Sequence, residues 1–88
     1  MCALEFCTDT VYYLGYPLVL GSAQRAVLHA LAVSRGEALD TDALARKSGV
    51  GRSNIAATVA AINQKAAVIG GRTLVLSGRG QGYRLCEY

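Results

Sequence analysis

The residues of this chain best suited to chemistry are its basic side chains, seven of which lie between residues 43 and 86. This segment contains no aspartate or glutamate and has a net charge of +7, whereas residues 1–42 carry two bases and five acids, a net charge of −3. A basic segment of this length attracts a polyanion, because every neutralised phosphate releases condensed counterions. The alternative is a solvated surface whose acidic partners lie elsewhere in the fold.

The other reactive side chains form no catalytic or metal-binding set. His29 is the single histidine, and Cys2, Cys7 and Cys86 include no CxxC pair, so the ligand spacing of a zinc site is missing. No carboxylate pair and no nucleophile with a neighbouring base is spaced for catalysis. We therefore expect a protein that is not an enzyme, holds no metal or cofactor, and keeps reduced thiols in the cytoplasm.

The length of the chain limits it to one small domain, residues 1–88. A chain of 88 residues buries only about 60–65% of the surface that its unfolded form exposes, which supports one core made of few elements. Its apolar runs are much shorter than the roughly 20 residues that cross a bilayer, and no secretory leader opens the sequence. We expect neither a membrane span nor a membrane partner.

Short antiparallel strands are expected within residues 3–20. Leu4–Cys7, Val11–Leu14 and Leu18–Leu20 are rich in aromatic and aliphatic residues, and turn signals separate them, the second being Gly15–Pro17. The end of the chain predicts another hairpin, the wing, over residues 73–86. Its strands would be Thr73–Leu76 and Tyr83–Cys86, joined by a glycine-rich loop.

Three helices are expected over residues 22–67. The first, Ser22–Ser34, would be capped by the side chain of its first residue, and the second, residues 41–48, by Asp40. The third runs from about residue 52 to residue 67. Its apolar side chains recur at helical spacing and form a buried stripe of Ile55, Val59, Ile62 and Ala66.

Ala45, Gly49 and Ile55 have the spacing of a helix-turn-helix. A small residue such as Ala45 lets the two helices approach closely, and Gly49 adopts the left-handed backbone of the turn at little cost. With the basic charge and the following hairpin, this spacing predicts an α+β winged helix-turn-helix: N-terminal antiparallel strands, three helices and a C-terminal β-hairpin wing. An ordinary αα-corner is the alternative.

The last strand ends in a motif with a known counterpart. The run Arg79-Gly80-Gln81-Gly82-Tyr83-Arg84-Leu85, with the leading strands and the Asp40-capped helix, resembles the DNA-binding effector domains of OmpR/PhoB-type response regulators, which end in an R-G-x-G-Y-R-L hairpin. The resemblance covers residues 4–85. It implies a bacterial transcription regulator that binds double-stranded DNA at repeated half-sites in the nucleoid, as a homodimer or tandem assembly. A receiver domain or an RNA polymerase subunit is implied as a further partner.

The third helix, residues 52–67, would then lie in the major groove, and the wing on phosphates or the minor groove. The family's recognition helix carries several basic residues, whereas the exposed positions here hold mainly Ala, Ser, Thr, Asn and Gln. Ala and Thr contact thymine methyl groups, and Asn and Gln pair with adenine. The residues expected to bind DNA are Arg52, Ser53, Asn54, Thr58, Asn63, Lys65, Arg72, Arg79 and Arg84.

A second hypothesis is a degenerate winged helix that binds protein through its alanine-rich third helix. Ala56, Ala60 and Ala67 form a small-residue strip with Asn63 between them, which allows another backbone to approach closely. The same strip also follows from helix propensity alone, because alanine is the best helix former at surface positions.

Overall fold

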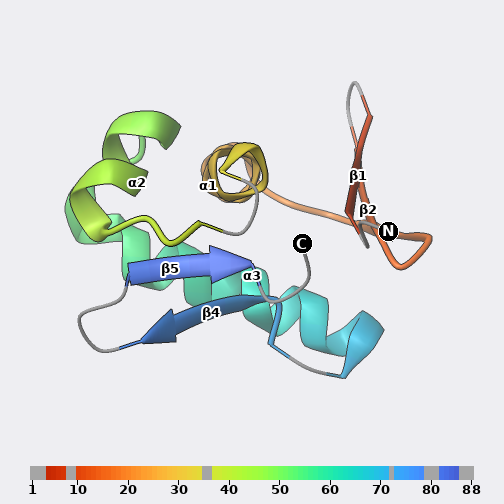
Figure 1. The fold of residues 1–88 in the computed structure, drawn as a ribbon. Helices are drawn as coiled ribbons and strands as arrows, with labels where there is room; N and C mark the ends of the chain where they lie inside the picture. The colour runs from red at the N-terminus through yellow and green to blue at the C-terminus, as the bar shows by residue number, and fades with distance from the viewer. Residues whose placement is uncertain (1–3, 8–9, 35–36, 72, 79–81, 86–88) are drawn as a thin grey trace.

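The computed structural model describes residues 4–7, 10–34, 37–71, 73–78 and 82–85. A three-stranded antiparallel sheet is followed by three helices and a two-stranded hairpin (Figure 1). This order confirms the predicted winged-helix fold. None of the helices in this part of the chain is long and apolar enough to cross a bilayer.

The N-terminal sheet has the order β1–β2–β3, with strands Leu4–Phe6, Val11–Tyr13 and Tyr16–Leu18. A turn lies where predicted but one residue earlier than Gly15–Pro17, because β2 and β3 are joined by Leu14 and Gly15, both with positive φ. Such a two-residue turn matches the twist of a hairpin. The strand predicted at Leu18–Leu20 is wrong, since β3 ends at Leu18. Pro17 lies within β3, at the edge of the sheet, where its missing N–H removes no ladder hydrogen bond.

The first two helices are α1, Ser22–Val33, and α2, Thr41–Ser48. The predicted Ser22 cap is wrong: the N-cap of α1 is Gly21, whose N–H donates to the Gln24 side chain at 3.0 Å. The Asp40 cap of α2 is confirmed, since its carboxylate accepts the Ala43 N–H at 2.7 Å. Left-handed Gly49 ends α2, as the helix-turn-helix spacing predicts.

The third helical segment begins as a 3₁₀ turn, η1 (Arg52–Asn54), and continues as α3, Ile55–Gly70. It runs three residues further than predicted and stops at Gly71, which is left-handed. The predicted stripe of Ile55, Val59, Ile62 and Ala66 is buried. It packs against Val27, Leu28, Leu31 and Leu44 of α1 and α2 in one core.

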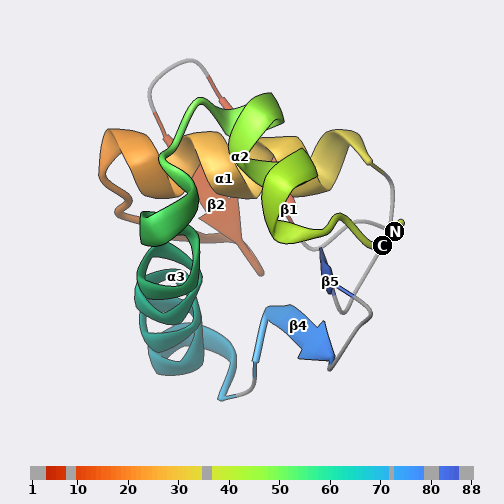
Figure 2. The ribbon, with the colours of Figure 1, turned by 90° about the vertical axis from the view of Figure 1, so that its left-hand side faces the viewer.

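The wing hairpin consists of β4, Val75–Gly78, and β5, Gly82–Leu85. Its first strand starts two residues later than predicted, because Leu74 is buried in the core before the ladder begins. A backbone bridge joins Tyr83 of β5 to Leu39, the residue before the α2 cap. Figure 2 shows α3 with α1 and α2 at one end and the wing hairpin to its side.

Candidate nucleic-acid interface

The face of α3 that points away from the core carries no charged side chain. We call it the outward face; it comprises Ala57, Ala60, Gln64 and Val68 and continues into Ser53 of η1, at intervals of three or four residues. All five residues are exposed, Val68 to 88%. Gln64 and Ser53 are therefore the only side chains of this face that can form hydrogen bonds with a base edge.

Three of the predicted contact residues lie at the start of α3. Ser53 and Asn54 are exposed in η1. Thr58 is half-buried, and its hydroxyl donates to the Asn54 carbonyl at 2.7 Å, so the proton of that hydroxyl is already engaged within the helix. The Thr58 hydroxyl therefore remains available to a ligand only as an acceptor.

Asn63 lies on the flank of α3 that contacts the wing hairpin. Its amide nitrogen donates to the Val75 carbonyl at 3.0 Å, and its amide oxygen accepts the Val75 N–H at 2.8 Å. Both ends of the amide are thus engaged by the first residue of β4. The structure does not bring Asn63 to the outward face.

Lys65 lies on the opposite flank of α3, toward α1. Its ammonium donates to the Gln24 side chain at 2.8 Å, and the residue is half-buried. This contact links α3 to α1 across 41 residues of sequence. Lys65 therefore stands apart from the other predicted contacts.

Arg52 is exposed in η1 and forms an ion pair with Asp42 of α2, with Nε and Oδ1 3.0 Å apart. The two side chains are 74% and 62% exposed, so water and salt screen the pair and its contribution to stability is small. A phosphate could replace the Asp42 carboxylate as the partner of Arg52. Asp42 is therefore placed to compete with a polyanion.

We expect Asp42→Asn to raise the affinity for duplex DNA about two- to fivefold, because it frees Arg52 and removes a nearby negative charge. Fluorescence anisotropy of a labelled duplex measures the change. Glu37→Gln is the matched control, since it removes one exposed acid that forms no ion pair with Arg52. Equal gains in both variants would mean that net charge alone acts and that Arg52 is outside the interface.

Three further basic side chains of the described residues lie on α2 and β5. Arg84 is exposed on β5, whereas Arg72 and Arg79 fall outside the described residues. Arg46 and Lys47 are exposed in the last turn of α2. The DNA-binding residues predicted from the sequence do not include Arg46, Lys47 or Gln64. Arg46 and Lys47 nevertheless contribute to the net charge of residues 43–86.

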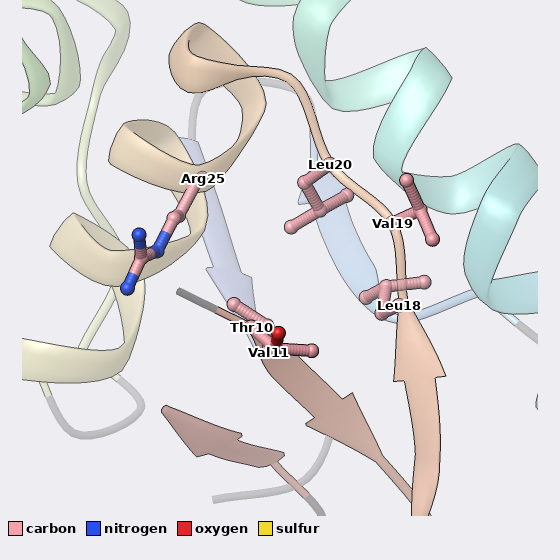
Figure 3. A pocket seen from close by; sticks show the side chains of 6 residues that line it. All are labelled: Thr10, Val11, Leu18, Val19, Leu20 and Arg25. Carbon is pink, nitrogen blue, oxygen red and sulfur yellow. The ribbon is translucent and has the colours of Figure 1, made fainter. Parts of the chain in front are cut away.

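A small pocket of about 120 Å³ lies between the N-terminal sheet and α1, away from these bases. It is smaller than the roughly 300 Å³ at which ligand sites begin. Arg25 at its edge donates to the Cys7 carbonyl at 2.8 Å. Among the described residues, no three His, Cys, Asp or Glu side chains lie together as metal ligands. The six residues around the pocket are Thr10, Val11, Leu18, Val19, Leu20 and Arg25 (Figure 3).

Comparison with known proteins finds similarity in structure only. The chain matches no protein-family model and no curated protein sequence. It is similar to a crystal structure of the DNA-binding domain of the response regulator AdeR in complex with an intercistronic region. The TM-score is 0.85 at 17% identity, and the match covers 100% of this chain and 98% of that one.

A second similar structure belongs to a family of redox sensors in the streptococci that evolved from two-component response regulators. Its TM-score is 0.83 at 19% identity, and the match covers all of this chain but 41% of the other. Both neighbours thus share the order of sheet, three helices and wing hairpin over the whole length of this chain. The chain has the winged-helix fold of response-regulator DNA-binding domains.

Proposed function

We propose that this chain is the DNA-binding domain of a transcription regulator, with η1 and α3 in the major groove and the wing hairpin on phosphates or the minor groove. The observation that carries the proposal is a set of exposed basic residues on α2 and η1, which contact α3, and on β5, which pairs with the α3-contacting strand β4. These bases are Arg46 and Lys47 of α2, Arg52 of η1 and Arg84 of β5.

In this proposal the basic side chains provide the affinity for DNA, and the outward face of α3 provides the sequence preference. Phosphate contacts fix the register of a protein on DNA without reading bases, whereas base edges in the groove are read by hydrogen bonds and apolar contacts. Ser53, Asn54 and Gln64 would form the hydrogen bonds, and Ala57 and Ala60 would contact thymine methyl groups. Arg72 and Arg79, outside the described residues, are proposed to add phosphate contacts.

A titration of labelled random-sequence duplex at low salt tests the proposal. We expect the anisotropy to rise with a dissociation constant of about micromolar order, and the affinity to fall with salt with a log–log slope of about −3.6 or steeper. This slope corresponds to four neutralised phosphates at about 0.9 each. An anisotropy that stays flat at low salt would rule out DNA as the ligand.

Arg84→Ala is expected to weaken binding to all duplexes alike and to reduce the magnitude of the salt slope by about one unit, the signature of one lost phosphate contact. The side chain is exposed on β5, so the fold should be unaffected. Titrations at several salt concentrations measure the slope. An unchanged slope would remove Arg84 from the interface.

The second candidate function is protein binding, and one observation favours it: the outward face of α3 carries no charged side chain from Ser53 to Val68. A degenerate winged helix could dock another protein there instead of DNA. This alternative predicts the flat anisotropy curve just described. A rise that salt reverses would contradict it as the main function.

The resemblance to OmpR/PhoB-type domains supports further parts of the proposal. The chain would act on the nucleoid in the bacterial cytoplasm, as a homodimer or tandem assembly on repeated half-sites. A receiver domain or an RNA polymerase subunit would be its protein partner. The streptococcal neighbour, in which the matching part makes up 41% of the chain, is an example of this fold within a longer protein.

A further inference from the structure

Asn63 connects α3 to the wing hairpin through both ends of its side-chain amide. The amide donates to the Val75 carbonyl at 3.0 Å and accepts the Val75 N–H at 2.8 Å. Val75 is only 1% exposed, so its backbone groups would lack a partner from water if Asn63 were removed. The side chain thus pairs with β4 as a neighbouring strand would.

The other strand of the wing hairpin is fixed in a similar way. Tyr83 of β5 exchanges two backbone hydrogen bonds with Leu39, at 2.8 and 2.7 Å. In an antiparallel pair, alternate residues turn their backbone groups away from the partner strand. Val75 and Tyr83 do so from opposite strands of the hairpin. The backbone groups of Val75 are bonded to Asn63 of α3, and those of Tyr83 to Leu39, in the segment before α2.

Two anchors of this kind add to the core packing of Val75 and Leu85 in setting the orientation of a hairpin that is too small to hold itself. An isolated two-stranded hairpin is marginally stable in water, so the direction in which Arg84 points depends on what β4 and β5 are bonded to. The Leu39 anchor holds the wing hairpin to the segment before α2. The Asn63 anchor holds the wing hairpin to α3, the proposed recognition helix.

We propose that Asn63 is a positioning residue for DNA binding: it fixes the wing hairpin relative to α3, so that Arg84 and the outward face meet the same duplex, and it reads no base itself. This inference rests on the proposed function. It replaces the role in base contact that the sequence suggests for Asn63, because both of its hydrogen-bonding ends are occupied within the protein. Preorganisation of this kind raises affinity without adding a contact to the ligand.

A double-mutant cycle tests the coupling. The affinity for random duplex is measured for the wild type, Asn63→Leu, Arg84→Ala and the double variant, with folding checked by circular dichroism. We expect Asn63→Leu to weaken binding about three- to tenfold, and the loss caused by Arg84→Ala to shrink in its presence. The reduction in salt slope caused by Arg84→Ala should shrink to less than about half.

Gln64→Leu is the matched control, because it removes a neighbouring amide that belongs to the outward face. Its effect should add to that of Arg84→Ala without coupling. Equal losses from Arg84→Ala with and without Asn63→Leu would overturn the inference. A changed preference between A·T-rich and G·C-rich duplexes with no coupling would identify Asn63 as a base reader, which also overturns it.

Amide hydrogen exchange gives a readout that does not need DNA. Asn63→Leu should speed exchange at Leu76 and Arg84 of the wing hairpin more than at α1, because the hairpin is loosened locally. Uniform acceleration, or none at the wing hairpin, would contradict the inference. If the proposed function is wrong, the wild type itself will not bind duplex DNA. The hydrogen-exchange result still decides whether Asn63 fixes the wing hairpin to α3.

Discussion

Ala60→Glu is expected to lower the affinity for random-sequence duplex by about 100-fold or more at low salt, because it places a carboxylate among phosphates on the outward face. Ala60 is exposed in the middle of α3, and glutamate is a good helix former. The change in the free energy of unfolding should stay within about 0.5 kcal/mol. The loss is therefore expected in binding alone.

Ala23→Glu is the matched control for this variant. Ala23 is exposed in the first turn of α1, so the substitution changes net charge equally but lies off the outward face. We expect its effect on affinity to stay within about threefold, because only a long-range repulsion that salt screens acts on the DNA. Equal losses from the two variants would mean that net charge, not the outward face of α3, governs binding.

Gly82→Ala is expected to lower the free energy of unfolding by about 3 kcal/mol or more, a large share of what a domain of this size has. Gly82 has φ +78°, and an added Cβ would lie 2.5 Å from the Leu39 carbonyl oxygen and 2.7 Å from its carbonyl carbon. The neighbour is backbone, so it cannot rotate away. The bridge between Leu39 and Tyr83 would have to open, and the wing hairpin would separate from the helices.

Gly71→Ala separates backbone strain from this overlap. Gly71 has a similar φ of +73°, but an added Cβ would meet nothing within 4 Å, so only the left-handed backbone is penalised, by about 1–2 kcal/mol. Thermal unfolding followed by circular dichroism compares the two variants, and the larger loss should lower the midpoint by more than about 10 °C. Equal losses of stability in the two variants would show that the close approach of Gly82 to Leu39 does not add to the cost of Gly82→Ala.

The helices could be predicted from the sequence because their signals are local. Asp40 caps α2 with its own side chain, Gly49 ends it in a left-handed conformation, and the buried stripe of α3 repeats with the period of the helix. Each signal depends on neighbours within a few residues. Such signals persist whatever the tertiary contacts are.

The wrong predictions lie at positions where two local signals compete, or where tertiary contacts decide the local structure. Pro17 suggests a turn, but the two positive-φ residues before it make a tighter hairpin and leave the proline on an edge strand. Ser22 is a good capping residue, yet Gly21 takes that position because Gln24 reaches back to its N–H. Leu74 fits a strand pattern but is drawn into the core before pairing begins.

The candidate site was harder to predict than the fold. Asn63 and Lys65 follow the buried Ile62 by one and three residues, so they lie on the two flanks of α3 and not on its outward face. Their partners, Val75 and Gln24, are 12 and 41 residues away in sequence. Pairing at such distances depends on the packed fold, which residue type and local spacing do not reveal.

We propose that duplex DNA binds to the outward face of α3 and to the wing hairpin. A titration of the ¹⁵N-labelled chain with a short duplex at low salt, followed by amide chemical shifts, tests it in one measurement. We predict shifts in η1, along the outward face of α3 and in β4–β5, with the signals of β1–β3 unmoved. An unchanged spectrum, or shifts confined to β1–β3, would contradict the claim.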